Sequence, residues 1–229
     1  MENQRKAPAL VFDLDGTLVD SVYQHVLAWQ QALQEEGIEL SVWRIHRKIG
    51  MSGGLFAQAL LRETQRDLSP DVLARLPDAH VRAYAERAEQ VRPLPGARQL
   101  LEQLTALRVP WAIATSGRIA GAGPTLERLP IPEGTPVITR DDVPNAKPAP
   151  DLFLEALRRL GVAANDAFVV GDSVWDMLAA RRAGTLGIGL LSGGYGQEEL
   201  EKSGAYRVYE DPADLLNHLD EIGIRHADV

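Results

Sequence analysis

The sequence predicts an α/β fold in which a core domain, built on a parallel sheet, carries an inserted all-helical domain. Short apolar runs, typical of strands buried on both faces of a parallel sheet, alternate along the chain with helical patterns. The alternation stops between about residues 20 and 91, where apolar residues recur at helical spacing instead. Four polar clusters follow predicted strands, which is where open parallel sheets place their ligands.

The first predicted strand, at residues 9–14 (ALVFDL), is almost wholly apolar and stops at Asp and Gly. Similar runs follow at 110–115, 136–139, 167–171 and 185–190. Leucines at 100, 101, 104 and 107 mark one intervening helix, and apolar residues at 152, 153, 156, 157 and 160 mark another. This order favours βαβ units over a meander. Near the C-terminus we expect an edge strand at 206–209 and a helix that begins at Asp211-Pro212.

The helical insert is predicted from residues at helical spacing, which are Val22, Val26, Trp29 and Leu33 and, further on, Leu55, Ala59 and Arg62. The chain leaves the sheet after its first strand and returns at 92–96 (RPLPG), a stiff Pro/Gly hinge. The two crossing points are therefore expected to lie close together. We assign residues 1–19 and 92–229 to the core domain and residues 20–91 to the insert.

The composition excludes several classes of protein. The 229 residues are 45% hydrophobic and 24% charged, as in a globular chain, and contain no cysteine. A disulfide framework, a thiolate zinc site and a catalytic thiol are therefore excluded. The net charge of −8 repels phosphate backbones and anionic lipids, which argues against nucleic-acid and membrane partners. No apolar stretch suits a secretory signal or a membrane span, so we expect a cytoplasmic protein, either a monomer or a homodimer.

The polar cluster after the first strand provides two carboxylates. Asp13 and Asp15 end a hydrophobic strand, and their side chains are expected to point the same way. Asp172, after a later strand, adds a third carboxylate and Asp176 a fourth, with no histidine among them. Because hard cations prefer oxygen ligands, this donor set favours Mg²⁺ over zinc.

The other clusters supply groups suited to a phosphoryl unit. The Thr115 hydroxyl, with Ser116 beside it, and the Lys147 ammonium would bind non-bridging oxygens, assisted by backbone N–H groups around Gly16 and Gly117. Taken singly, an Asp at a strand end is usually a turn former or a helix cap, and a lone lysine is usually solvated. Four clusters at corresponding positions favour a ligand site instead, and phosphate with Mg²⁺ is the predicted ligand.

These residues resemble the four motifs of the haloacid dehalogenase-like hydrolase superfamily. The motifs are residues 13–21 (DLDGTLVDS), Thr115, residues 147–151 (KPAPD) and residues 171–173 (GDS), in the order and spacing of that family. The helical insert resembles the cap domain of its phosphoglycolate phosphatase and β-phosphoglucomutase branch. The resemblance implies a Rossmann-like core and a phosphatase that acts on a small phosphorylated metabolite.

The resemblance also implies roles for individual residues. Asp13 would be the nucleophile that forms an aspartyl-phosphate, and Asp15 the acid/base that serves first the leaving group and then water. Thr115 and Lys147 would hold the transferred phosphate. The implied ligands of Mg²⁺ are Asp13, the backbone carbonyl of Asp15, Asp172 and, nearby or through water, Asp176.

Single residues distinguish this sequence from two other groups of enzymes in the superfamily. Haloacid dehalogenases lack the second Asp of the first motif, whereas Asp15 is present here. β-Phosphoglucomutases carry a His where His25 stands and a loop like Gly50-Met51-Ser52, but they place an Arg at the position of Gly53 to hold a second phosphate. Arg118 lies where the mutases have a basic residue, so this loss is partial. A simple phosphatase is therefore favoured over a mutase, and His25 is left out of the catalytic set.

Two hypotheses of other classes are a phospho-acceptor signalling domain and a catalytically silent scaffold. Signalling receivers are about half this length and carry the phosphorylated Asp on a middle strand, unlike Asp13. The scaffold is disfavoured because every motif residue is intact. Substrate choice is expected to depend on residues of the cap. The candidate residues, which the sequence does not rank, are Trp43, His46, Lys48 and Met51. The sequence also does not choose among phosphoglycolate, a sugar phosphate and a nucleotide as the substrate.

Overall fold

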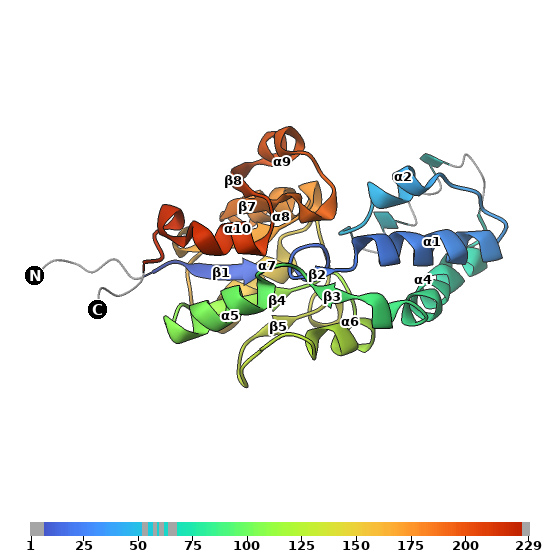
Figure 1. The fold of residues 1–229 in the computed structure, drawn as a ribbon. Coiled ribbons are helices and arrows are strands. Elements are labelled where there is room, and N and C mark those ends of the chain that lie inside the picture. Colours follow the sequence, from blue (N-terminus) through green and yellow to red (C-terminus); the bar gives the residue numbers. More distant parts are fainter. Residues whose placement is uncertain (1–6, 52–54, 57–58, 60–61, 64–67, 226–229) are drawn as a thin grey trace, which may run out of the picture.

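A six-stranded sheet forms the centre of the molecule (Figure 1). The computed structural model describes residues 7–51, 55–56, 59, 62–63 and 68–225. All neighbouring strands run parallel, in the order β5-β4-β1-β6-β7-β8. The strands are β1 (Ala9–Phe12), β4 (Trp111–Ala114), β5 (Val137–Ile138), β6 (Ala167–Gly171), β7 (Leu186–Leu190) and β8 (Ala205–Tyr209). This is the predicted Rossmann-like arrangement, with β1 between β4 and β6.

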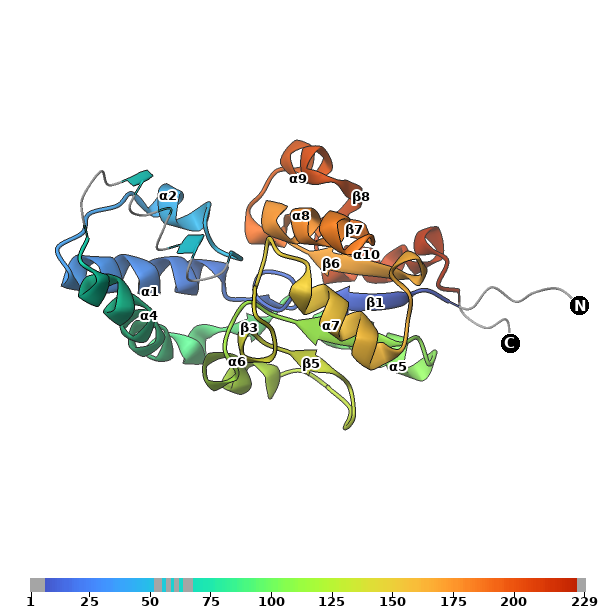
Figure 2. The same ribbon diagram turned by 180° about the vertical axis from the view of Figure 1, so that it is seen from behind.

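Helices cover both faces of the sheet (Figures 1 and 2). Buried side chains of α5, α6 and α10 pack on one face, and those of α7 and α8 pack on the other. The helices of this part are α5 (Ala97–Ala106), α6 (Ile119–Leu126), α7 (Asp151–Leu160), α8 (Val174–Ala183), α9 (Gln197–Ser203) and α10 (Pro212–Asn217). Short 3₁₀ helices lie at Ala88–Gln90, Arg140–Asp142, Ala164–Asp166, Leu191–Gly193 and Leu219–Ile222.

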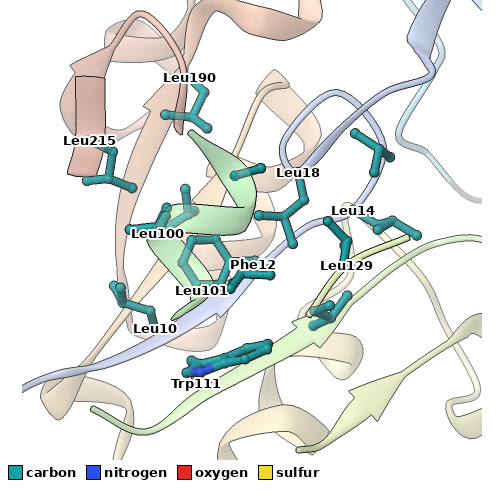
Figure 3. Close-up of a cluster of buried hydrophobic side chains, with 14 of the residues drawn as sticks. Leu10, Phe12, Leu14, Leu18, Leu100, Leu101, Trp111, Leu129, Leu190 and Leu215 are labelled. Atoms are coloured by element: carbon teal, nitrogen blue, oxygen red, sulfur yellow. The ribbon is translucent and has the colours of Figure 1, made fainter. Parts of the chain in front are cut away.

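The central strand β1 is buried on both faces because its side chains alternate between two hydrophobic clusters. Leu10 and Phe12 belong to the cluster that includes Leu100 and Leu101 of α5 (Figure 3). Ala9 and Val11 belong to the cluster on the opposite face, with α7 and α8. This double burial accounts for the continuous apolar run in the sequence.

The helical insert leaves and re-enters the sheet region through a short antiparallel ladder. β2 (Val19–Asp20) pairs with β3 (Arg92–Pro93), so the two crossing points lie side by side, as expected. Between them lie α1 (Val22–Glu35), α2 (Val42–His46) and α4 (Pro70–Ala85). These elements share a separate cluster of buried apolar side chains, and they lie beyond the carboxyl edge of the sheet (Figures 1 and 2).

The predicted elements are found with shifted ends. The strand expected at 136–139 is reduced to Val137–Ile138, because Thr139 instead caps the following 3₁₀ helix by accepting a hydrogen bond from Asp141 N. The edge strand is β8, and Asp211 caps α10 with Pro212 at its first position. The helix expected from residues 55, 59 and 62 lies partly outside the described residues, although these three positions are helical. Within the described part of the chain, no helix is long and apolar enough to cross a membrane.

Candidate active site

Three buried carboxylates meet at the carboxyl edge of the sheet. Asp13 follows β1, Asp172 follows β6, and Asp176 lies in the first turn of α8. Because β1 and β6 are parallel neighbours, their carboxyl ends bring Asp13 and Asp172 together. One carboxylate oxygen from each of the three residues lies within 4.8 Å of the others. The structure thus brings together three of the four predicted metal-ligand residues.

Asp176 has a structural role as well. Its Oδ2 accepts hydrogen bonds from the backbone N (3.1 Å) and the hydroxyl (2.5 Å) of Ser173, which caps α8. The remaining oxygen, Oδ1, lies 2.8 Å from Lys147 Nζ. Helix capping and participation in the cluster are therefore compatible, because the two oxygens serve different partners.

Lys147 is fully buried and joins the cluster by ion pairs with Asp13 and Asp176. Burial alone would lower the pKa of Lys147, but these carboxylates raise it above its usual value, so the ammonium is charged. One ammonium leaves the group of three carboxylates with excess negative charge. Burial, together with repulsion from the other carboxylates, raises the pKa of Asp13 to about 7 and that of Asp172 well above its usual value. An all-oxygen donor set with unbalanced negative charge fits a hard divalent cation such as Mg²⁺.

Asp15 does not join this group through its side chain. Its Oδ1 accepts a hydrogen bond from the Ser21 hydroxyl at 2.6 Å and lies 3.1 Å from His25 Nε2, while Thr115 Oγ1 is 3.5 Å from Oδ2. The strand ends at Phe12, before both residues, and the charge of Asp15 is close enough to raise the pKa of Asp13. The predicted contact of Asp15 with the metal through its backbone carbonyl stays a prediction.

Two histidines that the sequence did not place in the site lie behind Asp15, the first in contact with Asp15 and the second in contact with the first. His25 Nδ1 lies 3.1 Å from His80 Nε2, so a chain of contacts runs from Asp15 through α1 to α4. Burial of His80, with the nearby His25, lowers the pKa of His80 well below its usual value and keeps it neutral. Burial opposes ionisation of Asp15, but His25 and Ser21 lower the pKa of Asp15 overall.

The contact with Asp15 requires a proton on His25 Nε2. An ionised carboxylate oxygen only accepts, so His25 Nε2–H is the donor in this 3.1 Å hydrogen bond. His25 further stacks on Tyr84, with ring centroids 3.9 Å apart and planes inclined by 2°. His25 is fixed by these contacts. The only sequence signal for it was the resemblance to mutases, and nothing local in the sequence pairs residues 25 and 80.

The Thr115-Ser116-Gly117 cluster follows β4 and connects the sheet edge with the insert. Thr115 Oγ1 accepts a hydrogen bond from Gly117 N at 3.0 Å, and Ser116 Oγ donates to the backbone oxygen of Gly50 at 3.1 Å. Ser116 thus faces the insert. Gly16, with a φ of +81°, lies directly against Asp172, where an added Cβ would be 2.5 Å from Asp172 Oδ2.

The residues of the insert that were expected to set substrate choice make different contacts. His46 Nε2 donates to the backbone oxygen of Gly193 at 2.8 Å, whereas Lys48 Nζ pairs with Glu63 inside the insert at 2.5 Å. Trp43 is exposed and Met51 packs against the apolar cluster of the insert. Gly53, which distinguishes the chain from mutases, lies outside the described residues. Arg118 is exposed, with Nε 3.8 Å from Asp141 Oδ1.

The sequence and structure match those of known proteins. A profile of haloacid dehalogenase-like hydrolases matches residues 7–184. The chain belongs to the haloacid dehalogenase-like hydrolase family. This family hydrolase is 34% identical over 244 residues to phosphoglycolate phosphatase from Escherichia coli (strain K12), with 96% of this chain and 94% of the relative covered. It is 33% identical over 178 residues to fructose-1-phosphate phosphatase YqaB of the same organism, with 76% and 92% covered.

A solved structure is closer still. The crystal structure of a hydrolase from Pseudomonas syringae has a TM-score of 0.92 and 52% sequence identity, with 95% of this chain and 100% of that chain covered. The resemblance drawn from the four motifs is confirmed, as is the α/β fold class. The chain is accordingly an enzyme of the hydrolase class.

Proposed function

We propose that this family hydrolase is a Mg²⁺-dependent phosphatase that acts on a small phosphorylated metabolite through an aspartyl-phosphate on Asp13. The observation that carries the proposal is the convergence of Asp13, Asp172 and Asp176, with oxygens within 4.8 Å of one another, beside the buried Lys147. Two similar proteins are named as phosphatases of phosphoglycolate and of fructose 1-phosphate. A short phosphorylated acid or sugar is therefore the substrate class we favour.

The metal would be held by the three clustered carboxylates and the backbone carbonyl of Asp15. Mg²⁺ bound there supplies positive charge that offsets the repulsion between an anionic nucleophile and an anionic substrate. Lys147 supplies a second, permanent positive charge, because its ammonium is buried beside Asp13. Thr115, Ser116 and the N–H groups near Gly16 and Gly117 are the proposed phosphate contacts.

In the first step, a carboxylate oxygen of Asp13 forms a bond to phosphorus while the bond from phosphorus to the substrate oxygen breaks. Asp15 donates its proton to that leaving oxygen. The pKa of Asp15 is lowered by His25 and Ser21 against the effect of burial, which holds the carboxylate ionised. An incoming phosphate dianion is a like charge and raises that pKa, so substrate binding favours the protonated acid.

In the second step, the Asp15 carboxylate accepts a proton from water as the water oxygen bonds to phosphorus. The bond from phosphorus to the Asp13 oxygen breaks, inorganic phosphate leaves, and the Asp13 carboxylate is restored. The His25 Nε2–H, 3.1 Å from Asp15 Oδ1, orients the carboxylate for both steps. His80 Nε2, 3.1 Å from His25 Nδ1, holds the His25 ring on the side away from Asp15.

The division into a core domain (1–19 and 92–229) and a cap domain (20–91) belongs to the same proposal. The insert lies over the edge of the sheet that carries Asp13, and residues 46–50 contact the core through side chains and backbone. A cap in this place would exclude water from the aspartyl-phosphate until Asp15 has lost its proton to the leaving group and can activate a water molecule.

The test is a panel of phosphorylated compounds that includes phosphoglycolate, fructose 1-phosphate, other hexose phosphates and nucleoside monophosphates, scored by kcat/KM for phosphate release. We expect release that requires Mg²⁺ and is fastest with a short acid or sugar phosphate. An isomerase assay with hexose 1-phosphate runs in parallel, because isomerisation without phosphate release would identify a mutase. Absence of phosphate release from every compound, or release that persists in excess chelator, would refute the proposal.

A further inference from the structure

A short loop separates the acidic cluster from the helical insert. It consists of residues 192–194 (SGG), the last two residues of the 3₁₀ helix that follows β7 and the residue after them, and we call it the 192–194 loop. On its inner side, Gly193 lies so close to Asp172 that an added Cβ would be 1.7 Å from Asp172 Oδ2. Gly16, in the segment that follows β1, lies against the same oxygen, and Thr17 Oγ1 donates to Asp172 Oδ1 at 3.1 Å. The Asp172 carboxylate is thus held in a slot between two glycines.

On its outer side, the 192–194 loop is held by the insert. His46 Nε2 lies 2.8 Å from the backbone oxygen of Gly193, and because a carbonyl oxygen only accepts, His46 carries its proton on Nε2. The His46 ring stacks on Tyr23, with centroids 5.5 Å apart. A Cβ added at Gly194 would lie 3.0 Å from both His46 Nε2 and the Tyr23 hydroxyl, so the insert is packed closely on the loop.

The loop has one further anchor, on the core itself. Ser192 Oγ donates to the backbone oxygen of Gly16 at 2.6 Å. With Ser192 fixed from the core and the Gly193 carbonyl fixed from the insert, the backbone between them has little freedom to move away from Asp172. The contacts therefore join His46, the Gly193 backbone and the Asp172 carboxylate in one continuous series.

We propose that His46 is a positioning residue for the cation site: its hydrogen bond to Gly193 holds the 192–194 loop against Asp172 and so fixes the orientation of that carboxylate. The identity of the cation rests on the proposed function. A ligand that is already oriented loses less freedom when an ion binds, so the ion is bound more tightly when this contact is made. Groups behind metal ligands typically contribute 10–100-fold in metal affinity, and roughly that range applies here.

The coupling is reciprocal by thermodynamic necessity. If contact between His46 and Gly193 strengthens cation binding, the cation strengthens docking of the insert by the same factor. Mg²⁺ should therefore slow hydrogen exchange of backbone amides in residues 46–50 of wild-type protein, and it should do so less when position 46 cannot donate a hydrogen bond.

The experiment is calorimetric titration of the whole chain with MgCl₂, without substrate, in five proteins. They are the wild type, His46→Ala, His46→Gln, Trp43→Ala and Asp172→Ala. His46→Gln keeps a donor N–H at similar reach, and Trp43→Ala changes an exposed side chain of the same helix. We expect His46→Ala to weaken Mg²⁺ binding about 10-fold, His46→Gln to recover most of the loss, and Trp43→Ala to match the wild type. Asp172→Ala gives the reference for loss of a ligand.

Results that differ from these expectations would contradict the inference, and each would do so for a different reason. Wild-type affinity in His46→Ala overturns the role of His46 and leaves the proposed function intact, whereas failure of the wild type to bind Mg²⁺ overturns both. Equal losses in His46→Ala and Trp43→Ala would assign the effect to general damage of the insert. If His46→Ala does not fold, His46→Phe tests the same contact, because it keeps a ring to stack on Tyr23 but has no N–H donor; wild-type affinity there overturns the inference.

Discussion

The carboxyl edge of the sheet and the helical insert contribute to the same site in different ways. At the sheet edge, Asp13, Lys147 and Asp172 are almost fully buried, and their places follow from the ends of parallel strands and the loops beside them. In the insert, His25 and His46 are only partly buried and reach the core through single hydrogen-bond contacts. The difference teaches that the reacting groups sit on the rigid part of the molecule, while the insert orients them.

The largest expected effect lies at the sheet edge, in Asp13→Asn. The amide is a poor nucleophile, so we expect kcat for phosphate release to fall about 10³–10⁶-fold, the range found when a covalent nucleophile is removed. The control is Asp220→Asn, which changes an exposed carboxylate in a distant 3₁₀ helix. Phosphate release and acid-stable, protein-bound phosphate are both measured. Substantial activity in Asp13→Asn would mean that Asp13 is not the nucleophile and that the reacting groups do not lie at the sheet edge.

A smaller effect is expected on the insert side, from His25→Ala. Acid–base catalysis typically contributes 10²–10⁴-fold, and His25 only orients the acid/base, so we expect kcat to fall roughly 10–100-fold with little change in KM. His25→Gln, which retains a donor near Asp15, should recover part of the loss. His218→Ala, on the surface beside α10, is the matched control. A fall as large as that of Asp13→Asn would mean that the insert supplies a reacting group.

The sheet edge could be predicted from the sequence because its geometry is repeated in every parallel sheet. Strands buried on both faces leave continuous apolar runs, and their ends gather at one edge whatever residues follow. Asp13, Lys147 and Asp172 were therefore expected together, and the structure brings them together with Asp176. The contacts of Asp15 with Ser21 and His25 could not be predicted in this way, because Asp15 lies beyond the end of the strand at Phe12.

The contacts of the insert could not be predicted in the same way. His25 and His80 are 55 residues apart, and His46 and Gly193 are 147 apart, on elements joined by no common periodic pattern. Their meeting depends on how α1, α2 and α4 pack on one another and on the core. A lone His on a packed helix gives the same local signal whether it orients a carboxylate or fills an interface.

The smallest expected effect concerns Arg47, which joins the insert to α9 on the core. Its guanidinium pairs with both carboxylate oxygens of Glu199 and lies 4.1 Å from the ring centroid of Tyr195. The pair is well exposed, at 38% and 44% of the two side chains, and such pairs contribute about 0.2–1 kcal/mol. Tyr195 and Trp175 donate to the backbone oxygen of Arg47, at 3.1 and 3.3 Å, and these bonds survive truncation of its side chain.

Arg47→Ala should therefore raise KM by no more than about fivefold, the equivalent of roughly 1 kcal/mol, and leave kcat nearly unchanged. The difference from wild type should shrink in high salt, because salt screens the lost pair. Arg75→Ala, which removes an exposed pair with Glu36 inside the insert, is the control for loss of a surface charge. Steady-state kinetics at low and high ionic strength measure both variants. If Arg47→Ala instead lowered kcat as strongly as His25→Ala, docking of the insert as a whole, rather than the single contact of His25 with Asp15, would control the acid/base.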